Sequence, residues 1–170
     1  MSQPLYLDVT GATQGNISQK AFTADSVGNI YQEGHEDEIF CQSLSYHVTL
    51  PRDPQSGQVT GQRMHMPATL LKYVDKSSPL LLTSITSGEV LQITANYYRT
   101  STAGKQEKFY TVTFTDVILV ELRPYTPDAL DPTNAAYRDM EEIKFTYRAI
   151  QVTHVVAGTS GSDDWRQPKS

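Results

Sequence analysis

The sequence has a single cysteine, Cys41, so no disulfide framework can form within the chain. Its uninterrupted apolar runs are short, as in residues 117–120, and we therefore expect no membrane insertion. The first residues, MSQPLYLDVTG, lack a basic segment followed by an apolar stretch, so we expect no signal peptide. These absences favour a reducing compartment and argue against the general secretory route.

Basic residues are also scarce, since 14 Lys and Arg face 19 Asp and Glu and leave a formal charge of −5. Nucleic-acid binding requires a basic surface that displaces counterions from phosphates, so we expect no nucleic-acid partner. Apolar residues make up only 38% of the chain, whereas Ser and Thr are plentiful. The polar faces of the strands must then remain hydrated or pair with another chain.

Alternating apolar and polar residues predict β-strands over most of the chain. The clearest runs from residue 39 to 50, with one expected face of Phe40, Leu44, Tyr46, Val48 and Leu50 and another of Ser43, Ser45, His47 and Thr49. Other expected strands cover residues 5–11, 62–66, 69–74, 91–97, 110–114 and 143–156. We expect a bulge within residues 116–122. Residues 11–37 are expected to be mostly loop, with a short strand near Phe22 or Ile30. The pattern predicts a mainly β fold, an antiparallel barrel or two-sheet sandwich with one short flanking α-helix. We expect one domain over residues 1–160 and a loose tail over 161–170.

The predicted helix covers residues 79–87, within the stretch DKSSPLLLTSITSGE. Ser77 or Ser78 is expected to cap its first turn, Pro79 suits that turn and Gly88 suits the residue after its end. Leu81, Leu82 and Ile85 are expected to form its apolar stripe. The Lys-Ser-Ser cluster lacks the glycines of a phosphate-binding loop and has the wrong order for a Ser-x-x-Lys nucleophile, so it indicates a helix start.

Other candidate chemistry is weak. The run GHEDE at 34–38 puts neighbouring side chains on alternate faces, so we expect an acidic turn and no metal site. The remaining histidines are scattered, and no basic residue beside Cys41 favours a thiolate. We therefore expect no catalytic residues and no cofactor, and keep a β-barrel hydrolase using Cys41 or a histidine as a remote alternative.

The segment PRDPQSGQVTG at 51–61 interrupts the strands. Its prolines cannot donate ladder hydrogen bonds and its glycines favour turns, which predicts a protruding loop or irregular hairpin. From these residues alone, a contact loop and a mobile surface loop remain equally open.

Four stretches follow one another along the chain: PRDPQSGQVTGQRMHMP, DKSSPLLLTSITSGE, YYRTS and FTYRAIQVTHVVAGTSGSDDW. Together, and in this order, they resemble the haemolysin-coregulated protein (Hcp) family of bacterial type VI secretion systems, enterobacterial type. The resemblance covers most of residues 38–165 and implies a fold similar to phage tail-tube proteins. It implies hexameric rings that stack into an inner tube, which a contractile sheath expels from the bacterial cytoplasm together with a spike protein. It also implies secreted effectors in the ring lumen.

The resemblance assigns the ring or stacking contact to the loop that contains Pro51, Arg52, Asp53, Pro54, Gln55 and Gly57. Candidates for the lumen surface are Ser43, Ser45, Thr49 and Thr94, since a polar strand face suits a wet cavity. The main alternative is a ring whose principal task is to bind and stabilise one effector.

Overall fold

The computed structural model describes residue 3 and residues 5–167. The elements are β1 (Leu5–Gly11), β2 (Gly15–Asn16), α1 (Ala24–Val27), the 3-10 turn η1 (Gly28–Ile30), β3 (Ile39–Thr49), β4 (Met64–Tyr73), α2 (Ser78–Ser87), β5 (Leu91–Thr100), β6 (Gln106–Tyr125), the 3-10 turn η2 (Pro132–Asn134), β7 (Met140–Thr146), β8 (Ala149–His154) and β9 (Thr159–Asp164). The mainly β fold predicted from the sequence is confirmed.

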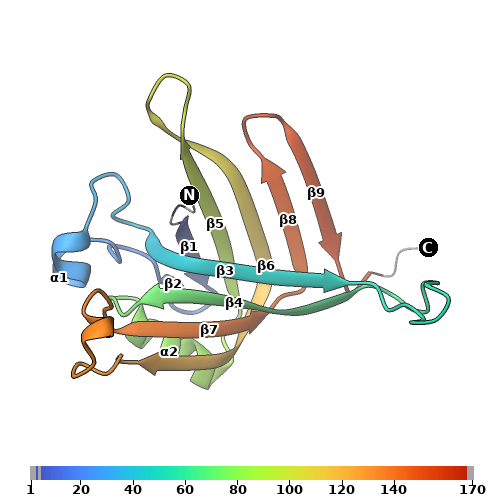
Figure 1. Cartoon of the computed structure of the whole chain (residues 1–170), viewed down its shortest axis with the longest axis horizontal. Helices are drawn as coiled ribbons and strands as arrows, with labels where there is room; N and C mark the ends of the chain where they lie inside the picture. The colour runs from blue at the N-terminus through green and yellow to red at the C-terminus, as the bar shows by residue number, and fades with distance from the viewer. Residues whose placement is uncertain (1–2, 4, 168–170) are drawn as a thin grey trace.

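The strands form a closed ring of antiparallel pairs in the order β1, β3, β4, β7, β6, β5 and back to β1. The hairpin of β8 and β9 continues the sheet from the first half of β6. Figure 1 shows β3, β4 and β7 running across the direction of β5, β8 and β9, so the ring has two crossing walls. The long strand β6 belongs to both walls, because its first half pairs with β5 and β8 and its second half with β7.

The bend that lets β6 change walls lies at Asp116, whose backbone φ is +53°. Its carboxylate accepts a 2.6 Å hydrogen bond from Arg148 Nε, and Arg148 N donates to the Thr115 carbonyl across the strands. Such conformations are rare outside glycine and persist when surrounding contacts hold them. Register irregularities at this bend and between Leu119 and Glu121 confirm the bulge predicted within residues 116–122.

The core fills the inside of the strand ring. Its largest buried side chains include Leu7, Ile39, Ile93, Phe114 and Phe145. Rings of Phe114 and Phe145 meet edge to face with centroids 5.0 Å apart, a favourable aromatic arrangement. Alternation thus places one face of each strand inside, as the sequence pattern predicted.

Phe40 was predicted to share one face of β3 with Leu44 and Tyr46, and this prediction is wrong. A register irregularity between Cys41 and Ser43 shifts the alternation, so Cys41 faces the main core while Phe40 packs outside the ring. There Phe40 joins a second cluster with Tyr6 and Phe22, which residues 17–38 cover. That covering segment holds α1 and η1, where the sequence suggested loop and a short strand.

Three further expectations need correction. Residues 143–156 form two strands, β7 and β8, because the chain turns at Arg148 to follow the bend of β6. The tail expected to be loose from residue 161 onward is ordered over 161–164, which belong to β9. Residues 168–170 of that expected tail lie outside the described residues. In addition, the four-residue α1 accompanies the single helix that was predicted.

Helix α2 begins with proline in its first turn and ends at Gly88, which adopts the left-handed conformation with φ +68°. Leu81 is buried against the core, but Leu82 is 54% exposed, so the predicted stripe is wrong for Leu82. Ile85 packs partly buried against the same core. No helix among the described residues is long and apolar enough to cross a membrane.

Candidate functional site

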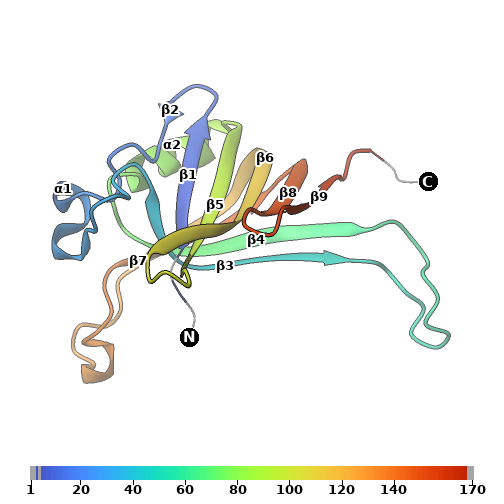
Figure 2. The ribbon, with the colours of Figure 1, turned by 90° about the horizontal axis from the view of Figure 1, so that it is seen from above.

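The most prominent surface feature is an arm, residues 47–66, formed by the ends of β3 and β4 and the loop between them. Figure 2 shows it extending far beyond the rest of the molecule. All six candidate residues of the predicted contact loop lie in it. The loop is an ordered hairpin, since Arg52 and Val59 form an antiparallel bridge and Thr60 N donates to the Pro51 carbonyl at 2.9 Å.

The tip of the arm is a turn organised by Asp53. Its carboxylate accepts hydrogen bonds from Ser56 Oγ at 2.7 Å and from Gln55 N at 3.1 Å, and these bonds lower the pKa of Asp53 below its ordinary value. Gly57 completes the turn with φ +74° and donates its N–H to the Asp53 carbonyl. The tip is thus shaped locally, with Pro51 and Pro54 restricting the backbone on either side of Arg52 and Asp53.

The base of the arm is clamped to the C-terminal hairpin. Arg63 donates two hydrogen bonds of 2.9 Å to the carboxylate of Asp163 in β9. His65 also contacts Asp163, with Nε2 at 2.7 Å, while its Nδ1 lies 2.9 Å from the hydroxyl of Tyr147. Because Tyr147 belongs to the core, this network connects the arm firmly to the strand ring.

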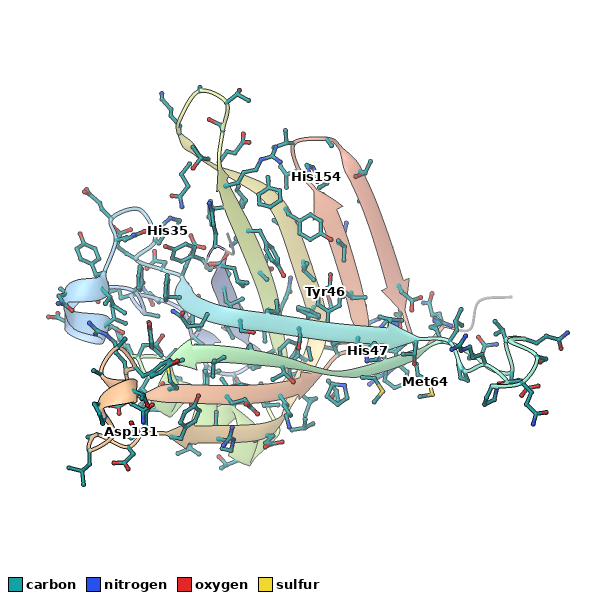
Figure 3. The ribbon with its side chains drawn as sticks, viewed as in Figure 1. His35, Tyr46, His47, Met64, Asp131 and His154 are labelled. Atoms are coloured by element: carbon teal, nitrogen blue, oxygen red, sulfur yellow. The ribbon has the colours of Figure 1, made fainter. Side chains whose placement is uncertain are left out.

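Large apolar side chains remain exposed along the arm. Val48, Leu50, Val59, Met64 and Met66 have exposed fractions between 42% and 61%. Figure 3 shows His47 and Met64 projecting from this part of the ribbon. An isolated two-stranded ribbon is marginally stable and exposed apolar surface favours association, so the arm has the character of a contact surface.

A polar face lies on the outer side of the wall made by β3, β4 and β7. Ser43, Ser45 and Thr49 alternate with the inward Leu44 and Tyr46, and Ser43 and Ser45 are exposed. These three candidate lumen residues therefore share one surface. The fourth, Thr94, pairs with Asp8 of β1 and Thr113 of β6 in the other wall, so the structure does not bring it together with them.

The polar face continues over β7 and the second half of β6 as a patch of balanced charges. Lys144 Nζ lies 3.1 Å from Glu121, and Arg123 Nη2 lies 3.2 Å from Glu142. The sequence analysis missed these four residues. The alternation of charged and apolar residues could have indicated part of this patch, because Glu142 and Lys144 flank the buried Ile143.

Two strand edges of this wall are unpaired in the described part of the chain. Residues 43–49 of β3 pair with β4 on one side only, because β1 reaches just residues 39–41. Residues 118–125 of β6 likewise pair with β7 alone. Exposed edges carry free N–H and C=O groups and serve as templates for pairing with another chain.

The DKSS stretch has a different chemistry from the one predicted. Ser77 makes no capping hydrogen bond to the helix backbone, because its hydroxyl donates to Asp75. Ser78 donates to Glu141 Oε2 at 2.8 Å, and buried Lys72 donates to both Asp75 and Glu141. The capping prediction is therefore wrong, and the cluster is a buried ionic junction around the helix start.

The candidate nucleophile Cys41 is buried, and burial raises its thiol pKa to about 11, so the thiol stays protonated near neutral pH. The histidines lie in separate places. His35 contacts Glu38 at 3.1 Å and stacks on Tyr6, whereas His154 accepts a hydrogen bond from Ala157 N. Within residues 5–167, no cluster of three His, Cys, Asp or Glu side chains is arranged to hold a metal ion.

Comparisons with known proteins agree on one family. The family described as "Type VI secretion system effector, Hcp" matches residues 6–154. The "Major exported protein" of Pseudomonas aeruginosa is 53% identical over 169 residues, covering 99% of this chain and 98% of the relative.

Solved structures give the same result. A crystal structure of an Hcp protein has a TM-score of 0.90 and 40% identity, covering 96% of this chain and 100% of the other. The secreted protein Hcp3 from Pseudomonas aeruginosa has a TM-score of 0.82 and 44% identity, covering 98% of this chain and 100% of the other. The chain therefore belongs to the Hcp family of type VI secretion proteins.

Proposed function

We propose that the chain forms hexameric rings that stack into the inner tube of a type VI secretion system. The observation that carries this proposal is the wall of β3, β4, β7 and the second half of β6, which among residues 5–167 has an unpaired edge at each end. The β3 edge of one copy pairs with the β6 edge of the next. Two different patches meet in this contact, and such a contact closes into a ring of six when each copy is rotated by about 60° from the last.

In this ring the polar face of the wall lines the lumen. Ser43, Ser45 and Thr49 would contribute hydroxyl groups, and the paired Lys144 and Glu121 would contribute charges of both signs. The apolar core lies on the other side of the wall, so water in the lumen would contact polar side chains and would not contact the core. Thr94 lies in the other wall and is not part of this surface.

The tube would be assembled in the bacterial cytoplasm, and the contractile sheath would expel it together with the spike. The test is export. We expect the chain in the culture medium of the bacterium that encodes it, and its loss from the medium when a sheath subunit is deleted. A cytoplasmic marker controls for lysis. Equal export without the sheath would contradict the proposal.

A second role, the holding of an effector, is favoured by the polar and charge-balanced face. Such a surface can bind varied proteins through hydrogen bonds without strong electrostatic selection. The experiment is co-purification of effectors with Ser45→Arg, with Thr94→Arg as the matched control in the other wall. We expect recovery to fall only for Ser45→Arg. Unchanged effector recovery in every variant of the polar face would contradict this role. We propose no catalytic activity for the chain.

A further inference from the structure

A cleft of about 580 Å³ lies between the α1 region, the end of β4 and the connection between β6 and β7. Its wall includes Val27, Tyr73, Val74, Tyr137 and Asp139. Arg138 holds one side in place by donating to the Val27 carbonyl at 3.4 Å and to Asn29 Oδ1 at 2.7 Å. The cleft is therefore built by ordered contacts, and it combines aromatic, aliphatic and acidic groups.

The cleft and the arm lie at opposite ends of the molecule. Figure 1 and Figure 2 both place α1 and the β6–β7 connection at one end of the long axis and the arm at the other. Figure 3 shows the same separation between the labelled Asp131, in that connection, and Met64. A single strand, β4, runs from the arm at Met64 to the cleft at Tyr73. Copies arranged head to tail along this axis would bring an arm to each cleft.

The arm tip and the cleft each carry an exposed charged side chain, and the two charges are opposite. In the arm, Asp53 is engaged by Ser56, and exposed Arg52 has no ion-pair or hydrogen-bond partner for its guanidinium within the described chain. In the cleft, Asp131 is engaged by Thr133, and the exposed Asp139 carboxylate has no such partner among residues 5–167. Among the described residues, the arm tip thus offers the Arg52 guanidinium and the cleft offers the Asp139 carboxylate, which carry opposite charges.

Apolar surface at the two ends is also complementary. Leu50 and Val59 beside the arm tip are 56% and 61% exposed, while Val74 and Tyr137 at the cleft are 43% and 63% exposed. Burial of such side chains on both partners would supply the hydrophobic part of a contact, with the charge pair at its margin. The cleft has room for a few side chains of a narrow hairpin tip, as the arm provides.

We propose that the cleft receives the arm tip of a second copy of this chain, with Arg52 facing Asp139. This contact rests on the proposed self-assembly and identifies the surface that the arm binds. Since arm and cleft are different patches, the contact is head to tail and gives the assembly a direction. Each copy uses its arm once and its cleft once, so the contact repeats along a stack.

Charge reversal tests the pairing. Arg52→Glu alone and Asp139→Arg alone each bring like charges together, and we expect each to reduce the fraction of stacked assemblies by about tenfold or more. The double variant Arg52→Glu/Asp139→Arg restores opposite charges and should stack like the wild type. A mixture of the two single variants should also recover, because each arm then finds a complementary cleft. Light scattering and negative-stain images measure the assemblies.

Each outcome decides one point. Singles that fail and combinations that recover support the contact. Singles that stack normally, or singles that fail without recovery in the double variant, overturn the pairing of Arg52 with Asp139 and leave ring formation standing. A wild type that never self-associates overturns the proposed function itself. Lys105→Glu reverses an exposed charge in the turn between β5 and β6 and should leave stacking unchanged.

Disulfide trapping gives a direct readout. Cys41 is the only cysteine and is buried, so new cysteines can be placed without interference. A chain with both Gln55→Cys in the arm and Ala135→Cys in the cleft should give a ladder of cross-linked species under mild oxidation. Chains with one of these cysteines should give no ladder. Absence of a ladder from assembled double-cysteine protein would overturn the contact.

Discussion

The guanidinium of Arg63 binds the carboxylate of Asp163 through two hydrogen bonds of 2.9 Å, joining positions 100 residues apart in the chain. The two side chains are only 13% and 17% exposed, so water screens the pair weakly. This pair and His65 fix the base of the arm to β9. The direction of the arm thus depends on a strand close to the C-terminus.

The first prediction concerns this clamp. Asp163→Asn keeps the shape of the side chain but removes its charge, and we expect a loss of about 1.5–3 kcal/mol in the free energy of unfolding, typical of hydrogen bonds to charged groups. Hydrogen exchange should rise most in residues 47–66. Urea denaturation and exchange mass spectrometry measure both effects.

The matched control is Glu107→Gln, which breaks the exposed pair of Arg99 and Glu107. These side chains are 42% and 31% exposed, and surface pairs contribute about 0–1 kcal/mol. Equal losses in both variants, or unchanged exchange in the arm of Asp163→Asn, would contradict the clamp.

The second prediction concerns the buried Lys72. Lys72→Met leaves the carboxylates of Asp75 and Glu141 without their cation in the interior, and we expect a loss of about 3–5 kcal/mol. Glu141→Met should cost less in the Lys72→Met background than in the wild type, by about 1 kcal/mol or more, because the two groups interact directly. A double-mutant cycle in urea measures this coupling.

Lys76→Ala is the control for Lys72→Met, since Lys76 is exposed and only four residues away. We expect it to leave stability within about 0.5 kcal/mol of the wild type. If Lys76→Ala were as damaging as Lys72→Met, the assignment of the buried junction would be wrong.

The third prediction compares neighbours on α2. Leu81→Asp places a charge where the side chain is 3% exposed and should destabilise the protein by more than about 3 kcal/mol. Leu82→Asp changes a side chain that is 54% exposed and should have little effect on the monomer. Thermal and urea unfolding separate the two. Similar losses would mean that Leu82 is also covered, for example by another copy.

The fourth prediction concerns Cys41 and the hydrolase alternative. Because burial raises its thiol pKa to about 11, Cys41 should not react with a thiol reagent at pH 7–8 while the protein is folded. Reaction should appear in step with unfolding in urea. Rapid modification of the folded protein at pH 7 would show an accessible thiolate and would reopen the question of a nucleophile.

Sequence reasoning predicted the elements whose signals are local. Alternation placed most strands, Gly88 marked the end of α2, and Pro51, Pro54 and Gly57 marked the arm hairpin. Ser43, Ser45 and Thr49 could be assigned to one face because they are separated by two and four residues, and residues an even number apart on a strand face the same side. These features depend on backbone preference and periodicity, which the sequence carries directly.

Other features depend on partners that are distant in the chain. No glycine or proline marks the irregularity after Cys41, so the outward turn of Phe40 follows from its packing against Tyr6 and Phe22. Lys72 follows the inward parity of Leu70, and its charge is accommodated in the interior because the carboxylate of Glu141, 69 residues away in the chain, lies 2.9 Å from it. The residues of β9, TSGSDD, have no apolar pattern that would predict a strand. They form a strand because their backbone pairs with β8.

We propose that the chain closes into a ring through the edges of β3 and β6 that are unpaired within residues 5–167. Native mass spectrometry of the wild-type protein tests it most directly. We expect a species of six times the 19.0 kDa chain mass, with ring-shaped particles in matching electron micrographs. A 19.0 kDa monomer at every concentration tested would contradict it.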